Sequence, residues 1–208
     1  ISYSTFGTHY YKSIGIDENK IFVAVNVVDT EKRLAQVYSY RLANELTERD
    51  SFRIFFIGAL EPNKKLDQLI GAVFILAKMG KDIELHIVGD GSSYNQIVKL
   101  CIEFGIDHLV YFYGELKGSI AHIACEMDVF VMPGLGGLAV SDMLCHGLPV
   151  ICGVGDGCEG DLIDGTNGLI IEELDQEHIA EVLINLINSP DRLADMKQNT
   201  IATIEKYS

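Results

Sequence analysis

Short apolar segments alternate with longer amphipathic segments along most of the chain, and this alternation limits the possible folds more than any other feature. The apolar segments are rich in Val, Ile and Phe, have the length of buried strands, and are mostly followed by glycine or proline. We expect strands at 21–28, 52–57, 83–88, 109–113, 129–132, 150–152 and 169–171. The pattern predicts an α/β fold with a Rossmann-like parallel sheet of about six strands, flanked by helices.

The segments between these strands carry apolar residues at three- and four-residue steps, which is the spacing of an amphipathic helix. Leu66, Leu69, Ile70 and Val73 show this spacing clearly. We expect helices at 31–48, 64–79, 92–104, 119–125, 139–146, 175–188 and 191–207. The first 20 residues are mixed in character, and we expect a short helix and a turn there.

Composition and charge exclude several classes of protein. The chain has 208 residues, of which 48% are hydrophobic and 22% charged, so wholesale disorder is excluded. Sixteen Lys and Arg stand against 30 Asp and Glu, and the net charge of −14 argues against a nucleic-acid partner. No apolar run approaches the ~20 residues of a membrane-spanning helix, so we expect no transmembrane segment.

The cysteines point to a reducing compartment. They are Cys101, Cys125, Cys145, Cys152 and Cys158. Their odd number and the lack of CxxC spacing favour reduced thiols in a cytoplasmic protein over disulfides or structural zinc. His122 with Cys125, and Cys145 with His146, could mimic metal ligands. These pairs fall on separate predicted helices and cysteine is commonly a small buried apolar residue, so we expect no metal.

Three glycine-bearing loops follow predicted strands, at 58–65, 89–91 and 133–138. Glycine lets a backbone approach an anion closely, and a helix that begins after such a loop presents free N–H groups. The third loop runs directly into a predicted helix, so its N–H groups could face a phosphate. Ordinary turn formation is the alternative for each loop, and 89–91 lacks the third glycine of a dinucleotide fingerprint.

Lys64 and Lys65 stand at the start of a predicted helix, where the helix dipole disfavours cations. One interpretation is a solvated helix start. The other is a bound anion that compensates both positive charges.

Five segments together resemble one family. They are FFIGALEPNKKLDQLIGA, LHIVGDG, VYFYGEL, DVFVMPGLGGLAVSDMLCHGLPVI and DGTNGLII. The stretch 52–170 resembles the C-terminal, nucleotide-sugar-binding domain of the family 4 glycosyltransferases, which are retaining enzymes of the two-domain GT-B fold. Residues 1–50 resemble the interdomain connection of that family, with AVNVVD as the strand that enters this domain.

The resemblance implies a nucleotide-sugar donor site at these loops. The implied donor contacts are Gly58, Lys64, Lys65, Gly89, Gly91, Glu115, Leu116, Gly134, Gly136, Gly137, Leu138, Ala139 and Asp142. Glu115 and Leu116 match the segment that runs along the base, and 136–139 matches the phosphate-binding turn. Lys64 and Asp142 are the implied catalytic residues. The resemblance implies no metal and no cofactor, because the nucleotide-sugar is a substrate.

The chain departs from the family pattern at two positions. The family places an arginine directly after the first glycine, where this chain has Ala59. Of its two acids, the second falls on Asp142 and the first on Gly134, which has no side chain. A lost charge-assisted hydrogen bond of about 1.5–3 kcal/mol corresponds to about one to two decades in rate, unless another cation replaces the arginine. Gly134 suggests altered sugar selection.

The resemblance implies the donor half of a glycosyltransferase that moves a sugar from a UDP- or GDP-sugar to a saccharide or lipid-linked acceptor with retention. We expect 1–20 to be the interdomain linker and the end of a missing N-terminal domain. We expect 21–190 to be the donor-binding domain, and 191–208 a helix that packs towards the missing domain. The acceptor would bind that domain, so the isolated chain is expected to catalyse little. We expect a cytoplasmic location, including the inner membrane surface for a full-length enzyme.

Ala59 and Gly134 keep a second hypothesis open, a degenerate non-catalytic domain that binds nucleotide-sugar and serves as a scaffold. A third is a GT-B-fold epimerase. It would need cleft carboxylates and a histidine that the sequence does not place.

Overall fold

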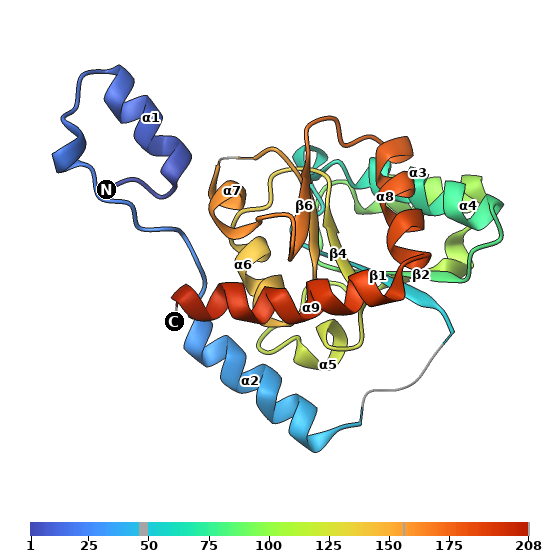
Figure 1. The fold of residues 1–208 in the computed structure, drawn as a ribbon. Coiled ribbons are helices and arrows are strands. Elements are labelled where there is room, and N and C mark those ends of the chain that lie inside the picture. Colours follow the sequence, from blue (N-terminus) through green and yellow to red (C-terminus); the bar gives the residue numbers. More distant parts are fainter. Residues whose placement is uncertain (46–49, 156, 208) are drawn as a thin grey trace.

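A six-stranded parallel sheet forms the centre of the molecule (Figure 1). The computed structural model describes residues 1–45, 50–155 and 157–207. The strands are β1 (Phe52–Ile57), β2 (Ile83–Val88), β3 (Val110–Phe112), β4 (Val129–Met132), β5 (Val150–Gly153) and β6 (Gly168–Ile171). Their order is β3-β2-β1-β4-β5-β6, which confirms the predicted Rossmann-like fold. The order reverses between β1 and β4, and in open α/β sheets ligands bind at the carboxyl edge beside such a point.

The central strands are buried because helices cover both faces of the sheet, whereas the edge strands β3 and β6 carry exposed residues (Figure 1). The longest run of pairing joins β1 to β2, from Phe52 opposite Ile83 to Ile57 opposite Val88. The side chains of β4 are fully buried, and Phe55 of β1 packs against Phe130 with ring centroids 6.4 Å apart. Continuous burial explains why these strands read as unbroken apolar runs.

The helices form two groups. On one side, α3 (Leu66–Lys78) packs against α4 (Tyr94–Phe104) and α8 (Gln176–Ile187). On the other, α6 (Leu138–Cys145) packs against α2 (Thr30–Ala43), α7 (Cys158–Leu162) and α9 (Pro190–Ile204), and α5 (Ala121–Ala124) lies against α2. Short 3₁₀ turns are η1 (Glu18–Lys20), η2 (Pro62–Lys64), η3 (Asp107–Leu109) and η4 (Glu205–Tyr207). Within the described part of the chain, no helix is both long and apolar enough to cross a bilayer.

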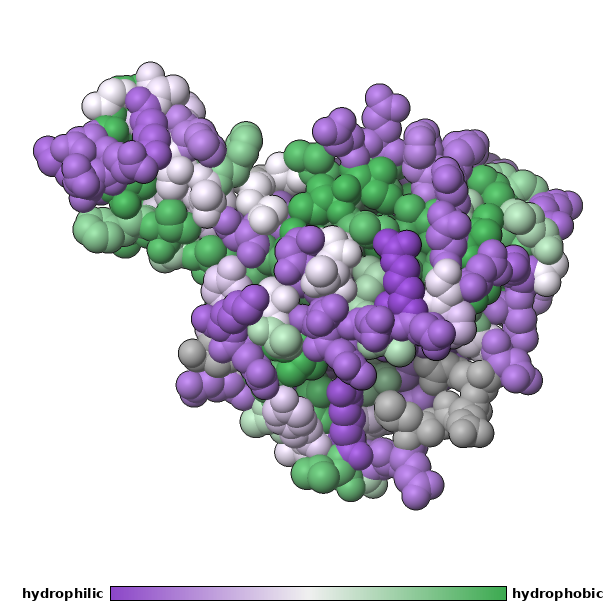
Figure 2. Space-filling view, in the orientation of Figure 1, coloured by the Kyte–Doolittle hydropathy of each residue, from purple (hydrophilic) through white to green (hydrophobic). Residues whose placement is uncertain are grey.

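The N-terminal arm, residues 1–29, projects from this body (Figure 1). It holds the expected short helix, α1 (Thr5–Ser13). The expected strand at 21–28 is wrong, because this segment forms only a single bridge, between Val23 and Ser2. Phe22 is 68% exposed, and Figure 2 shows hydrophobic residues on the surface of the arm. The segment has strand composition, but no neighbouring strand of the sheet pairs with it.

Several element boundaries also differ from expectation. The helix expected at 31–48 ends at Ala43, and 46–49 lie outside the described residues. The helix expected from Lys64 begins at Leu66, because Pro62 starts a 3₁₀ turn and Lys65 takes a left-handed conformation (φ 50°). The helix expected at 119–125 has only four residues, and α7 was not expected. The last helix, expected at 191–207, begins at Pro190.

Candidate functional site

The first two glycine loops pack backbone against backbone at the carboxyl edge of the sheet. A Cβ atom added to Gly89 would lie 1.9 Å from the carbonyl oxygen of Gly58, and one added to Gly91 would lie 2.6 Å from that of Leu60. The Gly58 N–H donates to the Val88 carbonyl (3.0 Å). Side chains are therefore excluded at Gly89 and Gly91, and the two loops form one continuous backbone surface.

The third loop closes onto the first. A Cβ atom added to Gly134 would lie 2.0 Å from the carbonyl oxygen of Asn63 and 2.6 Å from the Cα of Lys64. The Lys64 ammonium donates to the carbonyl of Leu135 in the third loop. This contact gives the physical reason for the glycine at the position of the family's first acid, since no side chain fits there without moving the 63–64 backbone. The predicted residues Gly58, Gly89, Gly91, Lys64 and Gly134 thus come together.

The sequence predicted Lys65 at the first turn of a helix, but the structure places it before the helix. It precedes α3 as its cap, with a left-handed backbone and an exposed side chain. The Lys65 N–H donates to the Pro62 carbonyl (3.1 Å), which closes the 3₁₀ turn. The turn therefore places the Lys64 side chain, and not that of Lys65, against the third loop.

A cavity of about 420 Å³ opens beside the first two loops. Its lining residues are Ile57, Gly58, Ala59, Val88, Gly89, Asp90, Glu115 and Leu116. Glu115 and Leu116, which the sequence predicted for the base, therefore share one cavity with the glycines. Ala59 lines it at the position of the family's arginine. The carboxylate of Asp90 accepts from the Gly91 N–H (2.7 Å), and the carboxylates of Asp90 and Glu115 are the acidic groups of the lining.

The third loop ends at Gly137, which caps α6 with a positive φ of 59° and no side-chain cap hydrogen bond. A helix start without a side-chain cap leaves its first N–H groups for another acceptor. The backbone of Leu138 and Ala139 begins α6, as predicted. This turn has the geometry of an anion site at a helix N-terminus.

The sequence did not single out Glu159, which supports this turn. Its side chain is buried, with the residue 2% exposed, and its carboxylate accepts from the Gly157 N–H (3.2 Å). A Cβ atom added to Gly136 would lie 3.3 Å from the Glu159 Oε1, and one added to Gly155 would lie 2.2 Å from that atom. Glu159 therefore fills the space between two glycine loops. The signal in the sequence was an acid two residues after closely spaced glycines.

Asp142 is not among the residues that line the 420 Å³ cavity. Its carboxylate lies 3.0 Å from the Arg33 Nε and 3.5 Å from the His146 Nδ1, and its side chain is 13% exposed. Burial raises the pKa of Asp142, while the charges of His146 and Arg33 oppose that shift. Burial also lowers the pKa of His146. In this structure the predicted ribose acceptor faces α2.

The possible metal ligands do not assemble. Among the described residues, no three His, Cys, Asp or Glu side chains group as a metal site. His122 is exposed, whereas all five cysteines are buried and none forms a disulfide. Burial raises the pKa of Cys145 to about 12, which marks it as an inert thiol.

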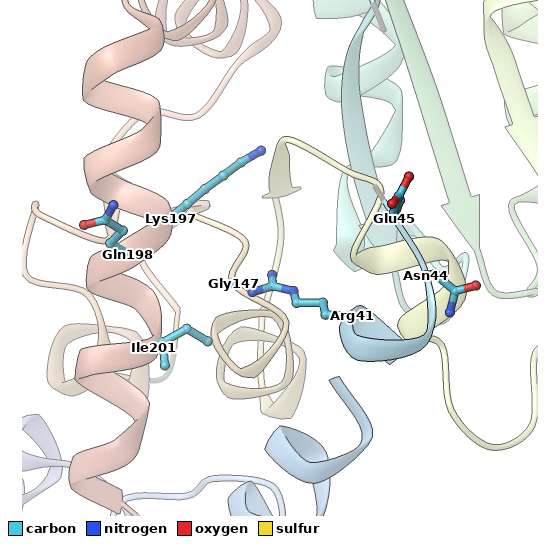
Figure 3. A pocket seen from close by; sticks show the side chains of 7 residues that line it. All are labelled: Arg41, Asn44, Glu45, Gly147, Lys197, Gln198 and Ile201. Carbon is cyan, nitrogen blue, oxygen red and sulfur yellow. The ribbon is translucent and has the colours of Figure 1, made fainter. Parts of the chain in front are cut away.

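A larger cavity, of about 800 Å³, lies between the end of α2, the turn after α6 and helix α9 (Figure 3). Its lining residues are Arg41, Asn44, Glu45, Gly147, Lys197, Gln198 and Ile201. Its two cations already have partners, because Arg41 donates to the His146 carbonyl (2.9 Å) and Lys197 pairs with Asp128 (2.8 Å). None of the predicted site residues lines it, so size alone does not identify the functional site.

The glycine loops and the uncapped start of α6 lie at the carboxyl edge of the parallel sheet, beside the point where the strand order reverses. Nucleotide-binding α/β domains have this arrangement. The family model for glycosyl transferases group 1 matches residues 41–203. The chain belongs to this family, and its fold is that of the C-terminal half of a GT-B glycosyltransferase.

Relatives and solved structures agree with this assignment. The chain is 26% identical to an uncharacterized glycosyltransferase of Methanocaldococcus jannaschii, with 97% of this chain and 59% of that protein covered. It is 28% identical to a GDP-mannose-dependent alpha-(1-6)-phosphatidylinositol monomannoside mannosyltransferase of Mycolicibacterium smegmatis, with 67% of this chain and 40% of that protein covered. The crystal structure of Anabaena HepE in complex with UDP superposes with a TM-score of 0.78 at 16% identity, covering 99% of this chain and 58% of that one. The chain therefore spans about half the length of the proteins it matches.

Proposed function

We propose that this chain is the donor-binding half of a retaining glycosyltransferase that uses a UDP- or GDP-sugar. The observation that carries the proposal is the meeting of the three glycine loops at one sheet edge, with Lys64 bridging the first to the third. Backbone N–H groups and one ammonium are the groups that bind a diphosphate. Two of the similar proteins support this class of nucleotide. One relative is named as GDP-mannose-dependent, and one similar solved structure is a complex with UDP.

The proposed reaction breaks the bond between the anomeric carbon and the diphosphate oxygen, and forms a bond from that carbon to an acceptor hydroxyl oxygen, whose proton passes to the departing diphosphate. Negative charge grows on the departing diphosphate. Lys64 and the first N–H groups of α6 stabilise that charge in the transition state, because they are fixed before the reaction begins. The proposal assigns no metal or cofactor to this step.

The cavity of about 420 Å³ is the proposed site for the base and ribose. Asp90 and Glu115 offer carboxylate acceptors there, and Leu116 with Ile57 offers apolar contact. Ala59 removes the arginine of the family pattern from this cavity. We propose that Lys64 therefore carries more of the diphosphate binding than it does in the family.

The acceptor belongs to the part of the enzyme that this chain does not span. We propose a saccharide or lipid-linked acceptor, bound by an N-terminal domain that precedes residues 1–20, with the last helix packing towards that domain. The relative that acts on a phosphatidylinositol monomannoside supports a lipid-linked acceptor. The lack of a disulfide among the five described cysteines supports a cytoplasmic location. The isolated chain is proposed to bind nucleotide but to transfer little sugar.

Titration of the chain with UDP and with GDP tests the donor site. The Lys64→Ala variant should weaken the preferred nucleotide by about tenfold or more, because a charge-assisted contact to the diphosphate is lost. Lys99→Ala is the matched control, since Lys99 lies on α4 and pairs with Glu103. The proposal fails if neither nucleotide binds at millimolar concentration, or if Lys64→Ala and Lys99→Ala behave alike.

The non-catalytic alternative rests on Ala59 and Gly134. Turnover separates it from the enzyme hypothesis, since a scaffold would bind the nucleotide-sugar without consuming it. A full-length protein that releases nucleoside diphosphate only when acceptor is present would exclude the scaffold.

A further inference from the structure

Helix α2 and the segment just before it contact α6 and its C-cap residue at three points. The Val28 N–H, just before α2, donates to the Ser141 Oγ (3.1 Å). The Arg33 Nε lies 3.0 Å from the Asp142 carboxylate. One turn of α6 further on, the Arg41 Nη2 donates to the His146 carbonyl (2.9 Å). These contacts run along α6 from its middle to its C-cap, so they hold the C-terminal half of this short helix against α2.

The second contact is the one between two opposite charges, and both side chains are largely buried. The Asp142 side chain is 13% exposed and the Arg33 side chain 27%. Asp142 Oδ1 is a buried atom that makes no hydrogen bond within the described residues, so its partners are the charges of Arg33 and, 3.5 Å away, the His146 ring. A buried carboxylate depends strongly on its cation, because removing one partner leaves an uncompensated charge. Asp142 therefore depends on a residue of α2.

The beginning of α6 is held by core packing through the buried side chain of Val140, and its first turn has no side-chain cap. It follows directly on Gly136 and Gly137, and Gly137 has no side-chain cap. Glu159 supports the Gly136 side, while α2 holds the face that carries Asp142. Movement of α6 would displace the N–H groups of residues 138 and 139, which the proposed function places at the diphosphate.

We infer that Arg33 is a positioning residue of the donor site, which locks α2 onto α6 through Asp142 and thereby sets the position of the 136–139 turn. Asp142 then acts through Arg33 and does not contact the donor. This inference rests on the proposed function and deepens it, because it connects the segment preceding the domain to the turn that binds the diphosphate.

The alternative is that Asp142 accepts from the ribose hydroxyls, as the family pattern implies. The two roles predict opposite effects of removing Arg33. A positioning pair loses its function when either partner is removed. A ribose ligand released from Arg33 would bind the donor equally well or better.

The test is a double-mutant cycle on this chain with Arg33→Gln, Asp142→Asn and the double variant, each titrated with UDP and with 2′-deoxy-UDP. Each single change should weaken UDP by about fivefold or more. The double variant should bind no worse than the singles, since the second change removes a partner already lost. The double variant buries no unpaired charge, so it reports on the pair even if Arg33→Gln fails to fold. Lys32→Gln, the same charge change on an exposed neighbour, should leave UDP binding unchanged.

The deoxy nucleotide separates positioning from contact. If Asp142 positions α6, Asp142→Asn weakens UDP and 2′-deoxy-UDP by the same factor. The inference is overturned if Asp142→Asn abolishes a preference for UDP over 2′-deoxy-UDP while Arg33→Gln leaves UDP binding intact or strengthens it.

Amide hydrogen exchange keeps this inference distinct from the proposed function. Arg33→Gln and Asp142→Asn should speed exchange in 136–145, and Lys32→Gln should not. If no form of the chain binds UDP or GDP, the donor site fails, yet the exchange rates still decide whether Arg33 holds α6. If the amide exchange rates of residues 136–145 are the same in Arg33→Gln and Asp142→Asn as in the unchanged chain, the positioning role of Arg33 is overturned, whether or not nucleotide affinity changes.

Discussion

The loops at the carboxyl edge and the N-terminal arm both combine glycines with apolar residues, yet the fold uses them in opposite ways. In the loops, glycine backbones touch one another, and the strands that carry them are buried. In the arm, Phe22 is exposed and Gly15 has open space around it. The segment 21–28 has the composition of β1, but β1 pairs with β2 and β4 whereas the arm forms a single bridge. An apolar run therefore becomes a strand only where a neighbour completes its hydrogen bonds.

The largest expected contrast is between two phenylalanines. Phe55→Ala should lower the free energy of unfolding by about 3–5 kcal/mol, because it opens a cavity in the core. Phe22→Ala in the arm should change it by less than about 0.5 kcal/mol, as exposed substitutions do. Urea unfolding of the two variants measures both values. Similar losses would show that the arm is part of the cooperative core.

Two glycines sharpen the comparison. Gly89→Ala should cost about 3 kcal/mol or more, because its Cβ would overlap the Gly58 carbonyl oxygen and its φ is 138°. Gly15→Ala, with a φ of 88° and open space, should cost only about 1–2 kcal/mol for the left-handed backbone. Equal costs in chemical denaturation would mean that the loops do not pack as tightly as described.

Restoring the acid of the family pattern tests the third loop. Gly134→Glu should lower the free energy of unfolding by about 2–3 kcal/mol, since the new Cβ would meet the Asn63 carbonyl and the Lys64 backbone. Nucleotide affinity should fall, because the Lys64 backbone must move away. A variant that keeps its stability and gains affinity would contradict the tight contact between the loops.

The smallest expected effect is a pH dependence at an exposed turn of the body. Hydrogen bonds from the Thr166 Oγ1 (2.7 Å) and N–H (2.9 Å) lower the pKa of Asp164. The stabilisation is therefore present above the unfolded pKa of Asp164 and is lost as pH falls through the lowered folded value. Thr166→Val should raise the pKa of Asp164 towards its ordinary value in an NMR titration. An unchanged midpoint would mean that the hydroxyl contributes nothing.

Much of the fold could be predicted because parallel strands buried on both faces leave a strong apolar signal. All six strands of the sheet were expected, and most helices were placed to within a few residues. The errors have physical causes. The left-handed Lys65 and the 3₁₀ turn at Pro62 move the start of α3, and α7 is too short for helical periodicity to show.

The candidate site was predictable where a backbone feature carried it. Gly58, Gly89 and Gly134 were predicted as loop positions where the backbone could approach an anion. The structure shows in addition that Gly89 and Gly134 lie against the backbone of the first loop, which the sequence did not predict. Glu159 was missed because its contact with Gly136 joins it to a loop more than 20 positions earlier, which no local pattern shows. The direction of the Asp142 side chain could not be predicted either, since it depends on an arginine 109 positions earlier in the chain.

The sequence alone determined the parallel α/β sheet, the glycine loops at its carboxyl edge and the resemblance to one glycosyltransferase family. Periodicity and glycine placement are local properties, and local residues suffice to show them. The tertiary structure decided which side chains face the loops, that Lys64 bridges them, and that Asp142 turns to α2. These depend on contacts between segments far apart in the chain, where packing and charge pairing select one arrangement from several that the sequence allows.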